Sequence, residues 1–105
     1  MTSAATRKIP ASTSEKPMLL LFTSRTDGHS RRVQGYLAQV LQRRHNHDTF
    51  NLQIIDVAQR SDLAQRLRID QVPTLIAIDQ RRVQGRLNNP RGCTEIQTFL
   101  APWLR

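Results

Sequence analysis

Apolar residues along the chain alternate between short continuous runs and helical spacing, and this alternation predicts strands and helices in turn. A continuous apolar run at residues 18–22, after Pro17, is typical of a strand buried on both faces. The i, i+3, i+4, i+7, i+8 spacing of an amphipathic helix follows in Val33, Tyr36, Leu37, Val40 and Leu41. Arg43 and Arg44 fall in its predicted last turn, where cations suit the helix dipole. A second strand at residues 52–57 implies a right-handed parallel crossover.

The second half of the chain continues this alternation. A short helix is predicted from Ser61, which can cap it, to about residue 68. Residues 74–79 and 82–87 predict a hairpin with a tight link that lacks the preferred Asn-Gly or Asp-Gly pair. A capping-box pattern of Thr94 and Gln97 opens a last helix, whose apolar face would hold Ile96, Phe99, Leu100 and Trp103. The order βαβ-α-ββ-α predicts one α/β domain, a mixed sheet flanked by helices on both faces.

The beginning of the chain shows no such periodicity. Residues 1–16 are therefore predicted to form a flexible N-terminal arm, which leaves residues 17–105 as the folded domain. The arm lacks the apolar segment of a secretory signal, and no apolar run approaches the length of a membrane span. A single cysteine allows no intrachain disulfide, which suits a reducing compartment. We expect a cytoplasmic protein without a membrane partner.

Charge adds one functional alternative. The chain has 16 basic and 8 acidic residues, a net charge of +8, and all of the basic residues except Lys8 and Lys16 are arginine. Such a surface attracts nucleic acid or acidic proteins over a distance. The arginines are scattered, however, and the few aromatics look committed to the core, so no stacking platform for a single strand is predicted. A basic adaptor for nucleic acid or an acidic protein is the second alternative function.

The turn between the first strand and the first helix resembles the thioredoxin family. Residues 22–33 read Phe-Thr-Ser-Arg-Thr-Asp-Gly-His-Ser-Arg-Arg-Val, and a later strand opens with Val72-Pro73-Thr74. In that family the turn carries Cys-Gly-Pro-Cys, and a cis-proline before Thr lies in the partner loop. The resemblance covers about residues 17–104 and implies a thioredoxin-like fold. It assigns the motif positions, in order, to Asp27, Gly28, His29 and Ser30.

The resemblance also implies that dithiol chemistry is lost. Thiol–disulfide exchange needs one thiolate to attack and a second thiol to resolve the mixed disulfide. Asp27 and Ser30 supply neither. The buried carboxylate that the family places on the preceding strand falls on Leu21, and the Trp before the first cysteine falls on Thr26. The first hypothesis is therefore a redox-inactive thioredoxin-like module, a protein-interaction or scaffold protein that needs no cofactor, and the sequence favours a protein without enzymatic activity.

The family resemblance implies a surface for such a partner. In the family, the backbone of the residue before the cis-proline pairs with an extended peptide. Here this would be Val72 beside Pro73, with Thr26 next to the motif and Asn89 at the position of a family glycine. Asn tolerates the left-handed backbone that such a position needs. The alternative that Pro73 only orders its loop stays open. The circadian-clock KaiB type of thioredoxin fold shares Pro-Thr-Leu here, but the hairpin and last helix follow the thioredoxin pattern.

Cys93 supplies the other alternative function. It comes just before the predicted cap Thr94, and the field of a helix N-terminus favours a reactive thiolate. An atypical thioredoxin-like oxidoreductase acting through Cys93 is therefore the first alternative. The structural interpretation is a small, half-buried residue packed at the helix entry, because cysteine is among the most buried residue types.

Two further clusters are considered and set aside. Asp27, His29 and Ser30 stand on one turn, which prevents the relay geometry of a catalytic triad; capping by Asp27 and Ser30 with an exposed His29 is the preferred interpretation. The polar loop predicted at residues 45–48 offers His45, His47 and Asp48. Zinc sites usually gather three or four ligands from a defined pattern, so no metal is expected here.

Overall fold

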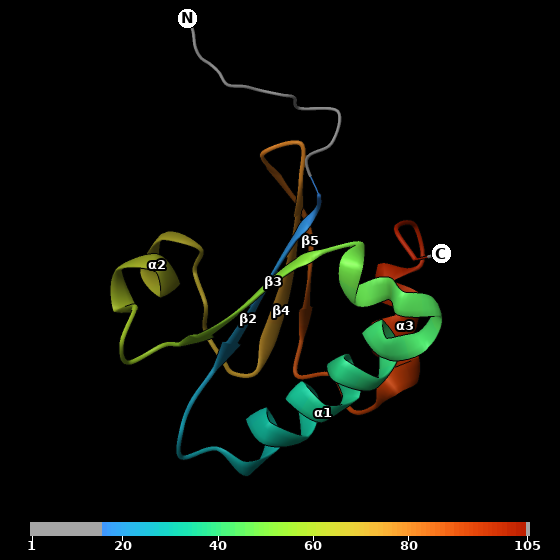
Figure 1. The fold of residues 1–105 in the computed structure, drawn as a ribbon. Coiled ribbons are helices and arrows are strands. Elements are labelled where there is room, and N and C mark those ends of the chain that lie inside the picture. Colours follow the sequence, from blue (N-terminus) through green and yellow to red (C-terminus); the bar gives the residue numbers. More distant parts are fainter. Residues whose placement is uncertain (1–15, 105) are drawn as a thin grey trace, which may run out of the picture.

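The computed structural model describes residues 16–104, apart from the side chain of His47. The predicted N-terminal arm lies outside these residues, except for Lys16. In the described part, a 4-stranded sheet has the strand order β3-β2-β4-β5 (Figure 1). The elements follow one another as β2 (Met18–Thr23), α1 (Gly28–Gln42), η2 (Arg43–Asp48), β3 (Asn51–Asp56), α2 (Ser61–Arg66), β4 (Thr74–Asp79), β5 (Arg82–Asn88) and α3 (Cys93–Leu100).

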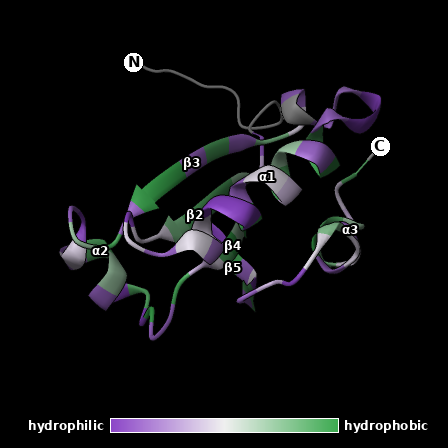
Figure 2. Ribbon diagram, turned by 90° about the horizontal axis from the view of Figure 1, so that it is seen from below, coloured by the Kyte–Doolittle hydropathy of each residue, from purple (hydrophilic) through white to green (hydrophobic). Residues whose placement is uncertain are grey.

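The sheet is mixed, as the sequence predicts. Strands β2 and β3 are parallel and enclose α1, whereas β2 pairs with β4, and β4 with β5, in antiparallel fashion. Helices α1 and α3 lie against one face of the sheet and α2 against the other (Figures 1 and 2). In Figure 2 the hydrophobic colour concentrates in the strands between these helices. The prediction of an α/β sheet with helices on both faces is confirmed.

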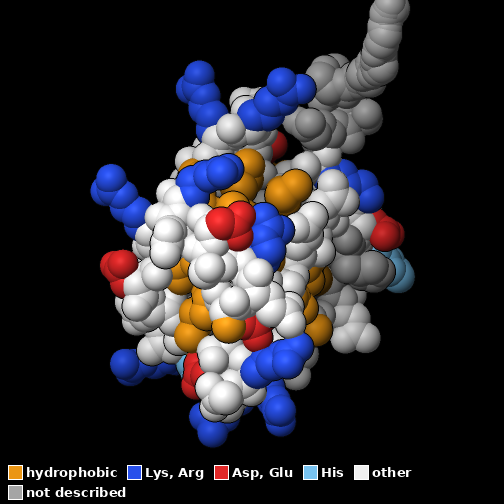
Figure 3. All heavy atoms as spheres, turned by 90° about the vertical axis from the view of Figure 1, so that its left-hand side faces the viewer, with side chains coloured by type: hydrophobic (Ala, Val, Ile, Leu, Met, Phe, Trp, Pro, Cys, Tyr) orange, Lys and Arg blue, Asp and Glu red, His pale blue; other side chains and the backbone are white. Residues whose placement is uncertain are grey.

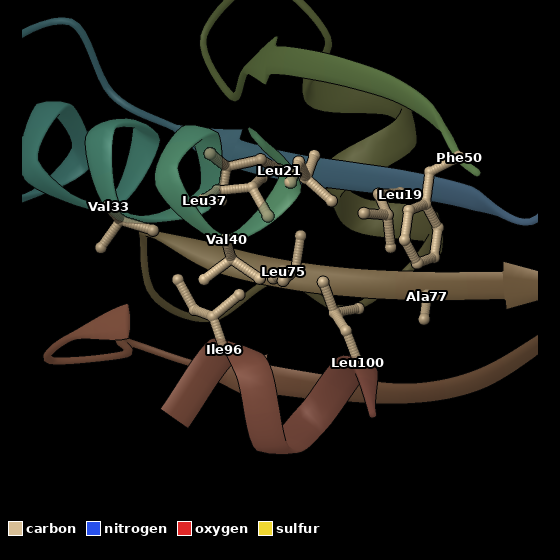
Figure 4. Packing of buried hydrophobic residues seen from close by; sticks show 11 residues of the cluster. Leu19, Leu21, Val33, Leu37, Val40, Phe50, Leu75, Ala77, Ile96 and Leu100 are labelled. Carbon is tan, nitrogen blue, oxygen red and sulfur yellow. The ribbon is translucent and has the colours of Figure 1, made fainter. Parts of the chain in front are cut away.

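The apolar run in β2 divides the core into two clusters. Leu19 and Leu21 belong to the cluster under α1 and α3 (Figure 4). Leu20 and Phe22 alternate with them and belong to the cluster under α2. All four side chains are at most 4% exposed, so the prediction of a strand buried on both faces is confirmed. On α1, four of the five predicted apolar positions are buried, and the fifth packs at the edge of the core: Val33, Leu37, Val40, Leu41 and, half-buried, Tyr36.

The ends of α1 and α2 differ from the prediction. Helix α1 ends at Gln42, so Arg43 and Arg44 lie beyond its last turn. The predicted polar loop is the irregular 3-10 segment η2, in which Arg44 has a left-handed backbone with φ 54°. The buried Asn46 side chain donates from Nδ2 to the Arg43 carbonyl at 2.7 Å, which turns the chain away from the helix axis. Helix α2 ends at Arg66, and its cap position is Arg60, without a side-chain cap.

The predicted capping box of α3 is wrong. The helix begins at Cys93, with Gly92 at the cap position and no capping side chain, so Thr94 already lies inside the first turn. Glu95 supplies the missing contact, because its Oε1 accepts a hydrogen bond from the Arg91 backbone N–H at 2.7 Å. Trp103 lies just past the helix and packs against the core cluster. Its Nε1 donates to Oδ2 of Asp79 at 3.0 Å, tying the chain end to β4.

The hairpin and the far side of α2 show how polar residues complete the fold. The hairpin link places both Gln80 and Arg81 at positive φ, 54° and 66°, as a tight two-residue turn requires even without glycine. From β5, the Arg86 guanidinium donates to the Arg68 carbonyl at 3.0 Å and also to the Leu67 carbonyl. It thereby satisfies carbonyls that the end of α2 leaves unpaired. Figure 3 shows Lys and Arg side chains projecting around the outline of the α2 side, with hydrophobic side chains between them.

Candidate functional site

The turn between β2 and α1 is held by its own side chains. Asp27 is the N-cap of α1, and its Oδ1 accepts the His29 backbone N–H at 3.2 Å. Its other oxygen, Oδ2, accepts the Ser30 hydroxyl at 3.1 Å. The Ser30 Oγ in turn accepts the Ser24 backbone N–H at 3.2 Å, and Ser30 is only 1% exposed. The carboxylate thus occupies the position at the helix N-terminus that favours an anion, and the prediction that Asp27 caps the helix is confirmed.

His29 is not exposed, which corrects the sequence-based expectation. Its side chain is half-buried, and its Nε2 lies 2.8 Å from the Pro90 carbonyl oxygen. A carbonyl oxygen only accepts, so the ring N–H donates and the hydrogen is on Nε2. This contact joins the start of α1 to the loop before α3, because Pro90 is itself buried in that loop.

The loop before β4 joins the same assembly. The Val72–Pro73 peptide bond is cis, and Pro73 is fully buried. The Pro73 carbonyl accepts the Asn89 backbone N–H at 2.8 Å, and Asn89 has the left-handed φ of 50° that suits its residue type. Together with the His29 contact to Pro90, this bond links the α1 turn, the Pro73 loop and the loop before α3.

Most of the residues predicted for the site therefore lie around these three linked loops. Thr26, Gly28 and Asn89 are exposed, whereas Val72 is half-buried. No hydrogen bond to either main-chain group of Val72 is found within residues 16–104. We call the surface of Thr26, Gly28, His29, Val72 and Asn89 the loop surface.

Cys93 directly follows one of these linked loops, the loop before α3. It stands at the first position of α3 and is half-buried at the edge of the α1–α3 core cluster. Its Sγ lies 3.1 Å from the Gln39 Oε1, where the thiol donates, and 3.8 Å from the Tyr36 carbonyl. Both partners are in the middle of α1. The described hydrogen bonds that join the three loops do not involve Cys93, and the thiol instead contacts α1.

The sequence did not indicate several polar contacts near the loop surface. The Thr74 hydroxyl donates to the Gln71 carbonyl at 2.8 Å, and its oxygen lies 3.2 Å from the Asn88 Oδ1. Arg25 forms an exposed ion pair with Asp56 at 3.6 Å. Beside it, a polar cavity of about 430 Å³ is lined by Thr23, Ser24, Arg25, Arg31 and Gln34. Contacts to carbonyls and ion pairs between distant residues have no local pattern, so the sequence contains no signal for them.

The described part of the chain also bears on two other possible functions, metal binding and membrane insertion. No group of three or more His, Cys, Asp or Glu residues gathers in residues 16–104 in a way that could hold a metal ion. In the same residues, every helix is too short or too polar to cross a bilayer.

Comparison with known proteins places this architecture in a family. The thioredoxin family model matches residues 4–102, and the chain therefore belongs to the thioredoxin family. The match begins within the stretch predicted as an arm. No curated protein sequence matches the chain.

Solved structures agree on the fold. Mitochondrial thioredoxin 3 from Saccharomyces cerevisiae is 14% identical with a TM-score of 0.72, over 85% of this chain and 80% of that one. The germline-specific thioredoxin Deadhead from Drosophila melanogaster is 16% identical with a TM-score of 0.75, over 87% and 84%. Trxlp from Edwardsiella tarda EIB202 is 15% identical with a TM-score of 0.75, over 88% and 85%. At these identities the likeness concerns the fold alone.

Proposed function

We propose that this chain is a non-catalytic thioredoxin-family module that binds a protein partner in extended conformation at the loop surface. One observation carries the proposal. Asp27 and Ser30, which the family resemblance assigns to the two cysteines, are bonded to each other and to the backbone. The loops around them are nevertheless held together where β2 ends and β4 begins, in the middle of the sheet.

The chemistry of the motif supports binding rather than turnover. Attack on a disulfide needs a thiolate, and release of the product needs a second thiol. A carboxylate and a hydroxyl cannot replace them. Here the Asp27 carboxylate caps α1, and the Ser30 hydroxyl, inside the first turn of the helix, donates to that carboxylate. The remaining thiol, Cys93, is turned toward the middle of α1.

The backbone beside Pro73 supports the mode of binding. The main-chain N–H and carbonyl of Val72 have no partner among the described residues, and the residue is half-buried. Half-buried backbone groups are normally paired, so an extended peptide that supplies main-chain hydrogen bonds would satisfy them. Such pairing does not depend on the side chains of the motif. It therefore survives the replacement of both cysteines.

The proposal has a matched test with two substitutions of the same type. Val72→Asp places a charge within the loop surface, whereas Val83→Asp places one on β5, where Val83 is 49% exposed. Partners are captured from native cells with wild type and with each variant. We expect wild type and Val83→Asp to retain the same proteins and Val72→Asp to lose them. Identical partner lists for all three chains would contradict binding at the loop surface.

A second measurement addresses catalysis directly. The purified chain is mixed with a protein disulfide and dithiothreitol, and the rate is compared with that of dithiothreitol alone. We expect no acceleration, because no thiol pair is present. Turnover that disappears in Cys93→Ser would instead establish the Cys93 oxidoreductase.

A further inference from the structure

A cleft lies at the carboxyl-terminal end of α1, opposite to the loop surface, and is not part of the proposed function. It has a volume of about 450 Å³, within the range of small-molecule clefts. Its walls come from the end of α1, from η2 and from the region of α3: Val40, Arg43, Arg44, Asn46, Gln97, Ala101 and Leu104. Because α1 has 15 residues, the cleft lies about 22 Å along the helix from the Asp27 cap. A ligand here would not touch the loop surface.

The cleft is positively charged. Arg43 and Arg44 both line it, and none of its lining residues within residues 16–104 is acidic. Within residues 16–104, ion pairs join Arg25 to Asp56 and Arg60 to Asp62, and neither cleft arginine has an acidic partner. A concave site lined by one sign of charge concentrates the field and attracts ligands of the opposite sign.

One of the two arginines, Arg43, is also held in place. The Arg43 guanidinium donates from one terminal nitrogen to the Gln97 Oε1 at 3.0 Å, which spans the cleft from η2 to α3. Its backbone carbonyl accepts from the buried Asn46 side chain at 2.7 Å. A guanidinium has five N–H donors, so the single bond to Gln97 leaves others for an anion. Such preorganisation lowers the entropy lost on binding.

Besides the arginines and the polar Asn46 and Gln97, the described lining residues are apolar. Val40 is 1% exposed and belongs to the core, while Ala101 and the half-buried Leu104 lie along the side formed by the chain end. A purely inorganic anion would use the arginines and leave this surface in water. A ligand that joins a carboxylate to an apolar group would cover both, and carboxylate matches the planar fork of arginine.

We propose that this cleft binds the carboxylate of an apolar organic acid, with the carboxylate on Arg43 and Arg44 and the apolar group over Ala101 and Leu104. The chemistry is shared by two sources, a free aliphatic acid and the carboxyl-terminal residue of a peptide. The inference does not rest on the proposed function, because the two surfaces are at opposite ends of α1.

The test uses NMR titration of the isotopically labelled full chain with three probes. N-acetyl-leucine represents a peptide terminus, hexanoate represents a free acid, and N-acetyl-leucinamide lacks the carboxylate. We expect saturable shifts of the amides of Val40, Gln97, Ala101 and residues 43–46 with one or both acids, and none with the amide. Tighter binding of N-acetyl-leucine identifies a peptide terminus as the source, and tighter binding of hexanoate identifies a free acid.

Three variants with the same change of charge complete the design. Arg43→Gln and Arg44→Gln should each weaken binding about tenfold, since a hydrogen bond to a charged group contributes at least that factor. Arg66→Gln removes an equally exposed charge from α2, on the other side of the sheet, and should leave affinity unchanged. The inference is overturned if the acids produce no saturable shifts at the cleft, if the amide binds as well as the acids, or if Arg66→Gln weakens binding as much as the cleft variants.

Discussion

At the amino-terminal end of α1, the Asp27 carboxylate faces the unpaired N–H groups of the helix and is fully engaged by His29 and Ser30. At the carboxyl-terminal end, Arg43 and Arg44 line a cleft in which none of the described lining residues is acidic. A helix carries partial positive charge at its first end and partial negative charge at its last. Side chains of complementary charge are present at both ends, but the partners differ. Both oxygens of the Asp27 carboxylate accept a hydrogen bond from within the chain, whereas the Arg43 guanidinium makes one hydrogen bond, to Gln97.

Because of this difference, the two ends of α1 are suited to different kinds of ligand. An external anion at the start of α1 would have to displace the Asp27 carboxylate, so we infer that recognition there uses the main chain of the loops. At the other end the charge is positive and without an acidic partner, so an external anion gains contacts without displacing a side chain. The two proposals therefore assign different ligands to the two ends of one helix, an extended peptide at its start and a carboxylate at its end.

Removal of the Asp27 carboxylate is expected to have the largest effect on the difference between the two ends of α1. Asp27→Ala should lower the free energy of unfolding by about 1 to 2 kcal/mol, the usual effect of losing an N-cap. The buried Ser30 hydroxyl also loses its acceptor, which adds to the loss. Urea unfolding followed by circular dichroism measures the change.

Asp27→Asn is the matched control for this prediction. Its amide oxygen still accepts the His29 N–H and caps the helix, while its NH2 group replaces the acceptor of the Ser30 hydroxyl, so its stability should lie between those of wild type and Asp27→Ala. An alanine variant as stable as wild type would mean that the cap does not hold the loop surface. The comparison between the two ends would then lose its structural basis.

The contact between His29 and Pro90 gives the next largest effect. His29→Ala leaves the carbonyl of the buried Pro90 without its donor, and an unsatisfied buried acceptor costs about 1 kcal/mol or more. Because the preceding residue, Asn89, donates its backbone N–H to the Pro73 carbonyl, amide hydrogen exchange of Asn89 should also become faster. His29→Gln keeps a donor of similar reach and should restore most of the protection. Exchange rates that are equal in all three proteins would show that the loops are not coupled through His29.

Local patterns in the sequence were sufficient for the architecture. The apolar run at residues 18–22 and the helical spacing from Val33 to Leu41 are periodicities that burial imposes directly. The ends of elements were harder, because competing side chains decide them. Asn46 turns back to the Arg43 carbonyl and ends α1 early, and Glu95, not Thr94, completes the start of α3.

The candidate site was predictable only in part. The resemblance indicated where Asp27, Ser30 and Pro73 stand in the chain, and capping chemistry indicated the role of Asp27. The bond from His29 to Pro90 was not predictable, because it spans 61 residues and ends on a carbonyl that every residue type has. The cleft at the other end of α1 depends on where this helix ends and on the turn at η2. The sequence pattern predicts Arg43 and Arg44 within the last turn of the helix, so it does not predict the cleft.

The smallest expected effect concerns stability at the carboxyl-terminal end of α1. Arg43→Gln removes an exposed side chain whose hydrogen bond to Gln97 crosses the cleft. Substitutions of exposed residues usually change stability by less than about 0.5 kcal/mol, and we expect a value within that limit by urea unfolding. Gln97→Ala removes the same bond from α3 and should match it. A loss as large as that of Asp27→Ala would show that the Arg43 bond is needed to hold η2 against α3, and the two ends of α1 would then differ less than their charges suggest.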